Sequence, residues 1–263
     1  MDPALAQRGT PFPLLGKDPQ RDTRCLPPGQ LQQTRRQHRT DQVGGLDREG
    51  APQGRGIDPA AHGVGVSALG RGTARESRAG LVTASLAIDD LIAGSGVAYR
   101  ALACPSFYEN LLEDAESIRE RGVFTDTADA DRRALMVAAA DIAAAAAGLL
   151  LERSWSGVGS VPVLGPRDLS PPDLARVMTD ELGRPVRYER QSLDDLRATM
   201  LGHGLAEAFV EGMVDMQRAK DEGLDEGADR ASRAVVPGTD FARWCARTLK
   251  PAVLAAPEAT GGR

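Results

Sequence analysis

Lysine, histidine, cysteine and aromatic residues are all scarce in this chain. Of its 263 residues, three are lysine against 32 basic residues in total, three are histidine, three are cysteine, and 4% are aromatic. The cysteines lie far apart with no C-x-x-C pair, and the histidines form no H-x-x-x-H pair, so neither a metal site nor a disulfide framework is predicted. This cysteine usage is typical of a reducing cytoplasm.

Long apolar runs and an excess of positive charge are also missing. The longest apolar run, Ile142 to Leu151, is alanine-rich and short, which favours a buried helix over a membrane span. No apolar segment follows a basic start, as it would in a secretory signal. The net charge of −5 argues against a nucleic-acid binder, which normally has a basic face. We therefore expect a cytoplasmic protein with no membrane contact and no direct nucleic-acid partner.

Residues 1–62 differ in composition from the rest. Eight of the ten glutamines and eight of the 17 prolines lie there, and the apolar residues follow neither a period of 2 nor one of 3.6. Such a segment cannot bury enough apolar surface to offset its chain entropy, so disorder is expected. It is either a natural arm, with Arg35, Arg36 and Arg39 against an anionic surface, or a stretch translated out of frame or from a wrong start.

From Val64 onward, short apolar strands alternate with helical segments. This alternation predicts an α/β fold with a mainly parallel sheet covered by helices, and the part beyond Ser192 is mostly helical. Strands are expected at 64–68, 97–102, 135–138, 161–164 and 186–190; helices are expected at 85–92, 106–119, 141–151, 170–183, 205–220 and 239–249, with one more after Ser192.

Several helix ends carry recognisable signals. Ser170 followed by two prolines is a good start for a helix, and Gly183 is a good end for it. Ser192 is expected to cap the next helix, and Asp141 to cap the alanine-rich one.

An ordered series of short motifs resembles the NmrA-like branch of the atypical short-chain dehydrogenase/reductase superfamily. The resemblance covers about Val64 to Leu254, and its motifs are weak singly but fairly specific in this order and spacing. They are Val66–Gly70, Gly96–Leu102, Pro105–Leu112, Asp141–Ala144, Leu164–Pro166 with Leu169 and Ser170, and Leu182–Val186.

The resemblance implies an NAD(P)-binding Rossmann domain and a smaller C-terminal domain that closes over the substrate. NADPH is favoured over NADH, the substrate is a quinone or another small molecule, and some relatives are non-catalytic redox-sensing regulators. The implied division is 1–62 disordered, 63–155 in the incomplete Rossmann-like sheet, 156–254 in the substrate cap, and 255–263 as a flexible tail. Oligomeric state is left open.

One family element is missing from the sequence. Such proteins open with a strand, a G-x-x-G-x-x-G turn and a helix that hold the pyrophosphate. Glycines are plentiful between Gly44 and Gly56, but no apolar strand precedes them and no amphipathic helix follows. This absence favours the out-of-frame interpretation of residues 1–62.

The resemblance assigns site residues to the carboxyl ends of two strands, where open α/β sheets bind their ligands. Ser67, Ala68 and Leu69 follow the first strand and are expected to contact the cofactor, or otherwise to cap a loop. Pro105, Ser106 and Phe107 follow the second and are expected to lie against the nicotinamide. Tyr108 is expected either to line the substrate cleft or to pack in the core.

The usual proton donor of short-chain dehydrogenases is not encoded. None of the three tyrosines has a lysine four residues later, and Ser85, Asp89 and Asp90 stand where an active relative has a helical lysine or histidine. No catalytic residue is therefore predicted, although hydride transfer to a quinone can proceed by positioning alone. The alternatives are a dinucleotide-sensing regulator that acts through a protein partner and an inactive truncated gene product.

Overall fold

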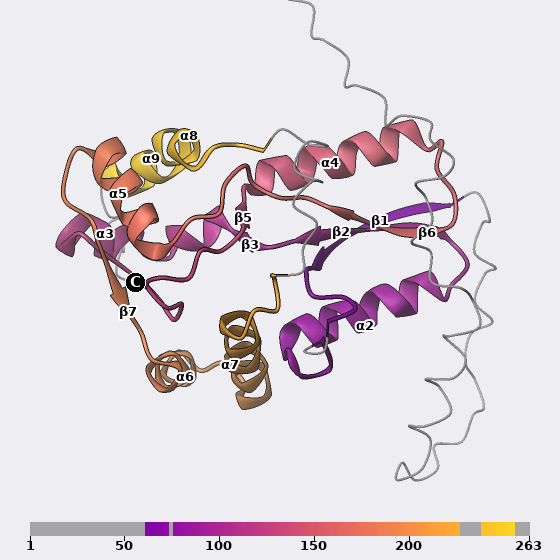
Figure 1. Cartoon of the computed structure of the whole chain (residues 1–263), viewed down its shortest axis with the longest axis horizontal. Coiled ribbons are helices and arrows are strands. Elements are labelled where there is room, and N and C mark those ends of the chain that lie inside the picture. Colours follow the sequence, from indigo (N-terminus) through magenta and orange to yellow (C-terminus); the bar gives the residue numbers. More distant parts are fainter. Residues whose placement is uncertain (1–60, 74–75, 227–237, 256–263) are drawn as a thin grey trace, which may run out of the picture. The chain divides into compact units, whose positions relative to one another are not determined.

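The computed structural model describes residues 61–73, 76–226 and 238–255 (Figure 1). Contacts divide the chain into two units, Met1–Gly54 and Arg55–Arg263, and every described residue lies in the second. The predictions for residues 1–60 and for most of the tail therefore lie outside the described residues.

Three parallel strands form the central sheet in the order β1-β2-β6. Strand β1 (His62–Ala68) pairs with β2 (Ala98–Cys104), which also pairs with β6 (Val158–Pro162). The parallel direction confirms the α/β class predicted from the alternating pattern. β6 joins this sheet although it follows the domain boundary expected at 155, and that division stays a prediction.

Two helices cover opposite faces of the sheet (Figure 1). Helix α2 (Leu81–Ala93) packs on β1 and β2 through buried Val82 and Leu86, and α4 (Ala139–Glu152) contacts the same two strands from the other side. The central strand β2 is shielded from water most completely, with Tyr99, Leu102 and Cys104 buried, whereas Val66 on β1 is exposed.

Two further parallel pairs extend beyond this sheet. The first joins β3 (Ser106–Phe107) to β5 (Met136–Val137), and the second joins β4 (Val123–Asp126) to β7 (Arg187–Arg190). β4 was not predicted from the sequence.

The remaining part is mostly helical, as predicted. Ser170 and Asp173 form a capping box at the start of α5, and the Ser192 hydroxyl accepts from the Asp195 amide at the start of α6, which confirms both predicted caps. The helices are α5 (Pro171–Leu182), α6 (Leu193–Gly202), α7 (Glu207–Asp221), α8 (Phe241–Trp244), the π-helical turn η4 (Cys245–Leu249) and α9 (Lys250–Leu254).

Two local predictions are wrong. The helix expected over 106–119 is divided into β3, a 3₁₀ turn η2 (Tyr108–Leu112) and a short α3 (Ala115–Arg121). Asp141 does not cap α4, which begins after Ala138; its carboxylate instead accepts from the amide and hydroxyl of Thr239, at 2.6 and 2.8 Å. The Glu109 carboxylate fills the capping role by accepting from the Ala139 amide at 2.9 Å.

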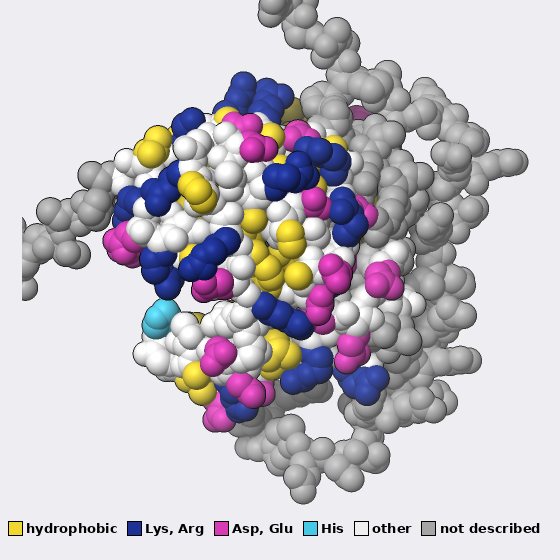
Figure 2. Space-filling view, turned by 60° about the vertical axis from the view of Figure 1, so that its left-hand side comes forward, with side chains coloured by type: hydrophobic (Ala, Val, Ile, Leu, Met, Phe, Trp, Pro, Cys, Tyr) yellow, Lys and Arg dark blue, Asp and Glu magenta, His cyan; other side chains and the backbone are white. Residues whose placement is uncertain are grey.

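Charges of both signs mix on one face of the molecule. Figure 2 shows a face on which basic and acidic side chains are interspersed with apolar ones. Within the ranges that the structure describes, no helix is long and apolar enough to cross a bilayer.

Candidate functional site

The parallel register brings the two predicted groups of cofactor residues to one edge of the sheet. Ser67 lies opposite Ala103 and Ala68 opposite Cys104, and the Leu69 amide donates to the Cys104 carbonyl at 3.2 Å. The segments 67–69 and 105–107 therefore leave the sheet side by side, at the carboxyl ends of β1 and β2.

The hydroxyl of Ser67 is held by a carboxylate on α2. It donates to Asp89 Oδ2, and the Tyr99 hydroxyl donates to Asp89 Oδ1 at 2.7 Å. Asp89 is buried, and its third partner is the Arg71 guanidinium, at 3.5 Å. Burial, reinforced by the Asp89 carboxylate, raises the pKa of Tyr99 well above its usual value, so this phenol stays protonated. The only proton that Ser67 can donate is thus already engaged within the chain.

The neighbouring side chains of the predicted cofactor group point into the protein. Leu69 is buried against Leu135 and Leu164, while Ala68 packs against the cluster that contains Leu224. Pro105 is buried as well. Contacts from these residues to a ligand would therefore be made by their backbone.

Ser106 is joined to the end of α7 by a lysine that no sequence motif singled out. Lys220 Nζ donates to Ser106 Oγ at 2.9 Å, and both residues are partly buried. Burial lowers the pKa of Lys220, an effect that the nearby Asp225 opposes and Arg132 reinforces. Because 114 residues separate Lys220 from Ser106, no local motif links the two in the sequence. The only feature that sets Lys220 apart there is that lysine is rare in this chain.

Two carboxylates near Lys220 pair with the guanidinium of Arg132. Its guanidinium lies 3.9 Å from the Asp221 carboxylate and 3.8 Å from the Asp225 carboxylate. Asp225 is buried, whereas Asp221 lies nearer the surface with 27% of its side chain exposed; desolvation still raises the pKa of Asp221. Both carboxylates therefore have a partner other than the lysine.

Tyr108, the predicted substrate residue, lies in a different cluster. It is 1% exposed, and its ring lies 5.0 Å from that of Phe241 and 5.6 Å from that of Trp244. Burial raises the pKa of its phenol. The structure thus places Tyr108 in the core and not beside Ser106 and Lys220, and a substrate role for it stays a prediction.

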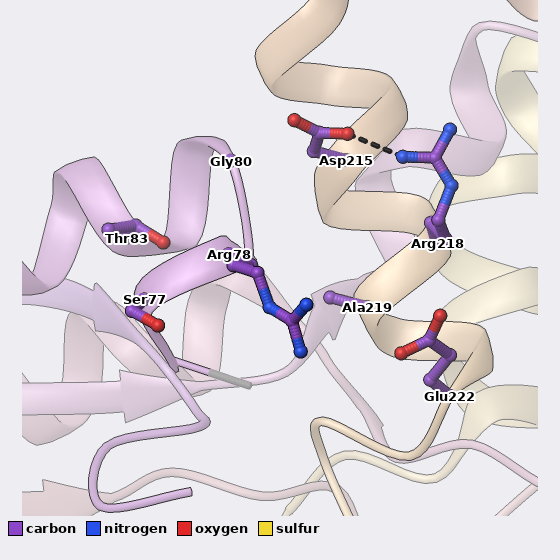
Figure 3. Close-up of a pocket in the computed structure, with 8 residues that line it drawn as sticks. All are labelled: Ser77, Arg78, Gly80, Thr83, Asp215, Arg218, Ala219 and Glu222. Carbon is purple, nitrogen blue, oxygen red and sulfur yellow. Dashed lines mark hydrogen bonds and ion pairs between the residues drawn. The ribbon is translucent and has the colours of Figure 1, made fainter. Parts of the chain in front are cut away.

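A cavity of about 600 Å³ opens between α7 and the start of α2, as Figure 3 shows. The Arg78 guanidinium points toward Ala219 and Glu222, while Arg218 turns away to pair with Asp215 at 2.5 Å. The sequence predicted none of these residues as a site. The lining consists of Ser77, Arg78, Gly80, Thr83, Asp215, Arg218, Ala219 and Glu222.

Among the described residues, no group of three or more histidine, cysteine, aspartate or glutamate side chains is placed to hold a metal ion.

Comparison with known proteins points to reductases. The chain is 32% identical over 122 residues to an NAD(P)H azoreductase of Xenophilus azovorans, covering 46% of this chain and 42% of the relative. It is 30% identical over 180 residues to quinone oxidoreductase 2 of Escherichia coli (strain K12), covering 67% of this chain and 61% of the relative. The chain thus spans about half the length of these relatives. No family model matches it.

Solved structures share the fold. An NADPH-dependent quinone oxidoreductase from Escherichia coli, complexed with NADPH, aligns with a TM-score of 0.55 and 24% identity over 69% of this chain and 63% of that one. NmrA, a negative transcriptional regulator solved in complex with NAD, aligns with a TM-score of 0.51 and 12% identity over 72% of this chain and 64% of that one.

Proposed function

From the chain's likeness in sequence and fold to NmrA-like NAD(P)-binding Rossmann proteins, we propose that it is an NAD(P)H-dependent reductase of a quinone or a similar small electrophile. The observation that carries the proposal is the edge where β1 and β2 end, which gathers Ser67–Leu69 and Pro105–Phe107. Both sequence relatives carry reductase names, which favours a reductase over a regulator.

The described residues fit one half of a dinucleotide better than the other. The segments that follow β1 and β2 lie together at the carboxyl edge of the sheet, where such ligands bind. A pyrophosphate, however, needs a helix N-terminus with free amides. The start of α2 lies against the Gly212 carbonyl, where a Cβ on Gly80 would come within 2.0 Å, and the start of α4 is capped by Glu109. Neither helix offers a pyrophosphate cradle.

In this proposal the segment Pro105–Phe107 holds the nicotinamide and Ser67–Leu69 borders it. When bound, the dinucleotide supplies a hydride; the chain orients the acceptor and excludes water from it. Residues 63–155 contain this edge, and the part of 156–254 that follows β6 forms the cap. We favour NADPH over NADH, and Tyr108 acts on the substrate only through the packing of the cap.

Fluorescence titration with NADPH, followed by its oxidation at 340 nm across a quinone panel, tests the proposal. Ser106→Tyr should weaken NADPH binding at least tenfold, because the larger side chain would occupy the edge where the nicotinamide is proposed to bind. A tenfold loss corresponds to about 1.4 kcal/mol of binding free energy. Ser156→Tyr is the matched control, because Ser156 is exposed and precedes β6, at the opposite end of the strands.

The outcomes separate the alternatives. Binding followed by quinone-dependent oxidation supports the reductase. Binding without oxidation favours the dinucleotide-sensing regulator, and absence of binding contradicts both.

A further inference from the structure

We infer that Lys220 is the proton donor of the proposed reductase, placing its ammonium group against the oxygen of the substrate that becomes a hydroxyl. This inference rests on the proposed function, and it supplies the group that the missing Tyr-x-x-x-Lys spacing left unassigned.

The end of α7 lies across the edge where β1 and β2 terminate. Ala219 and Leu224 are buried in one cluster with Ala68, the last residue of β1. The Leu224 side chain also covers Gly70, where an added Cβ would lie 2.7 Å from it. These contacts hold Lys220, on the last turn of α7, over the strand ends.

The hydrogen bond from Lys220 to Ser106 fixes the direction of the ammonium group. Ser106 directly follows Pro105 at the end of β2, so Nζ is 2.9 Å from a residue of the proposed nicotinamide site. An ammonium group has three donors, and this bond uses one of them. The partner is a neutral hydroxyl, so this bond itself does not neutralise the lysine charge.

The surroundings favour a lysine that releases its proton readily. Asp126, Asp221, Asp225 and Arg132 lie near the lysine. Arg132 forms ion pairs with Asp221 and Asp225. Burial then outweighs the attraction of Asp225 and Asp126, so the pKa of Lys220 falls below the ordinary lysine value. A donor whose pKa lies nearer the working pH is the better general acid.

The step balances with one proton from the lysine. A quinone that has accepted a hydride is a hydroquinone anion, with two added electrons and one added proton. An N–H bond of Lys220 breaks as the O–H bond of the hydroquinone forms, which leaves a neutral amine. The amine regains its proton from solvent before the next turnover.

Three variants test this role in steady-state kinetics over pH 6–10. Lys220→Met should lower kcat about 10²-fold or more, as for loss of a general acid, with little change in the dissociation constant of NADPH. Lys220→Arg should keep the quinone KM but not kcat, because a guanidinium donates hydrogen bonds without releasing its proton. Lys250→Met is the control: Lys250 donates to the Glu181 carbonyl, on α5, and should leave kcat unchanged.

The pH profile separates proton donation from a structural role. The wild-type kcat should fall at alkaline pH, as Lys220 loses its proton, and this limb should be absent in Lys220→Met. A second readout needs no turnover: protein labelled with ¹³Cε-lysine gives three lysine resonances, because the chain has three lysines. The resonance lost in Lys220→Met should titrate below the ordinary range of lysine and should shift when a hydroquinone is added with NADP⁺.

Two results would overturn the inference, and only one of them would also overturn the proposed reductase function. Equal kcat values and equal pH profiles for wild type and Lys220→Met would remove Lys220 from the reaction but leave the reductase intact. A wild-type chain that binds NADPH but reduces no quinone would remove the proposed function, and the proton donor with it.

Discussion

Replacement of Asp89 by alanine should be among the most destabilising single changes at the strand edge. The carboxylate, whose side chain is 8% exposed, accepts from both the Ser67 and the Tyr99 hydroxyls. Hydrogen bonds to a charged group contribute about 1.5–3 kcal/mol each, and the variant leaves two buried hydroxyls without an acceptor. We expect the free energy of unfolding to fall by about 3–5 kcal/mol. The loss stays below the full sum because water can hydrogen-bond to part of the two hydroxyls that are left.

Urea denaturation followed by circular dichroism measures this change. Asp90→Ala is the matched control: its side chain is 51% exposed and pairs with Arg71 at 2.9 Å, a surface bridge that contributes about 0–1 kcal/mol. Ser67→Ala and Tyr99→Phe should each cost less than Asp89→Ala, with a coupling to Asp89 of about 1 kcal/mol in double-mutant cycles. An Asp89→Ala variant as stable as Asp90→Ala would refute the reasoning.

Three other predictions follow from the packing. Gly80→Ala should lower the free energy of unfolding by more than about 2 kcal/mol, measured by thermal unfolding, because Gly80 has φ +52° and an added Cβ would lie 2.0 Å from a carbonyl oxygen. Gly148→Ala is the control: Gly148 lies in open space on α4, and the change should raise that free energy by about 0.5–1 kcal/mol. Burial raises the pKa of the Cys104 and Cys245 thiols to about 12. In a variant lacking Cys25, thiol reagents should therefore react only on unfolding, and stability should fall above about pH 8.5, where unfolded thiols ionise. The Ser170 amide, Arg176 and the Ser170 hydroxyl lower the pKa of Asp173 to about 2, so Asp173→Asn should reduce stability at pH 7 but not at pH 1.5.

The sequence predicted the parallel sheet well because its strands are short apolar runs with clear ends. The same logic placed Ser67 and Ser106 at one edge, since the carboxyl ends of neighbouring parallel strands coincide. Ser170 was identified as a cap because the signal lies within four residues of chain. These successes depend on local or periodic patterns.

The failures involve groups that meet only through the tertiary fold. Glu109 caps α4 from 30 residues away, which displaced Asp141 from the role that its own position suggested. The sequence assigned Asp89 no role, but in the structure it accepts from Ser67 and Tyr99. Lys220 carried no spacing signal at all.

The 114-residue separation between Ser106 and Lys220 also has a consequence for folding. Closing so long a loop costs more chain entropy than forming a helix turn or pairing β1 with β2, so this contact should form late. Mutations that loosen only the packing of α7 would then detach the lysine while the sheet remains folded. The proton donation that we infer for Lys220 would thus be lost well before the sheet unfolds.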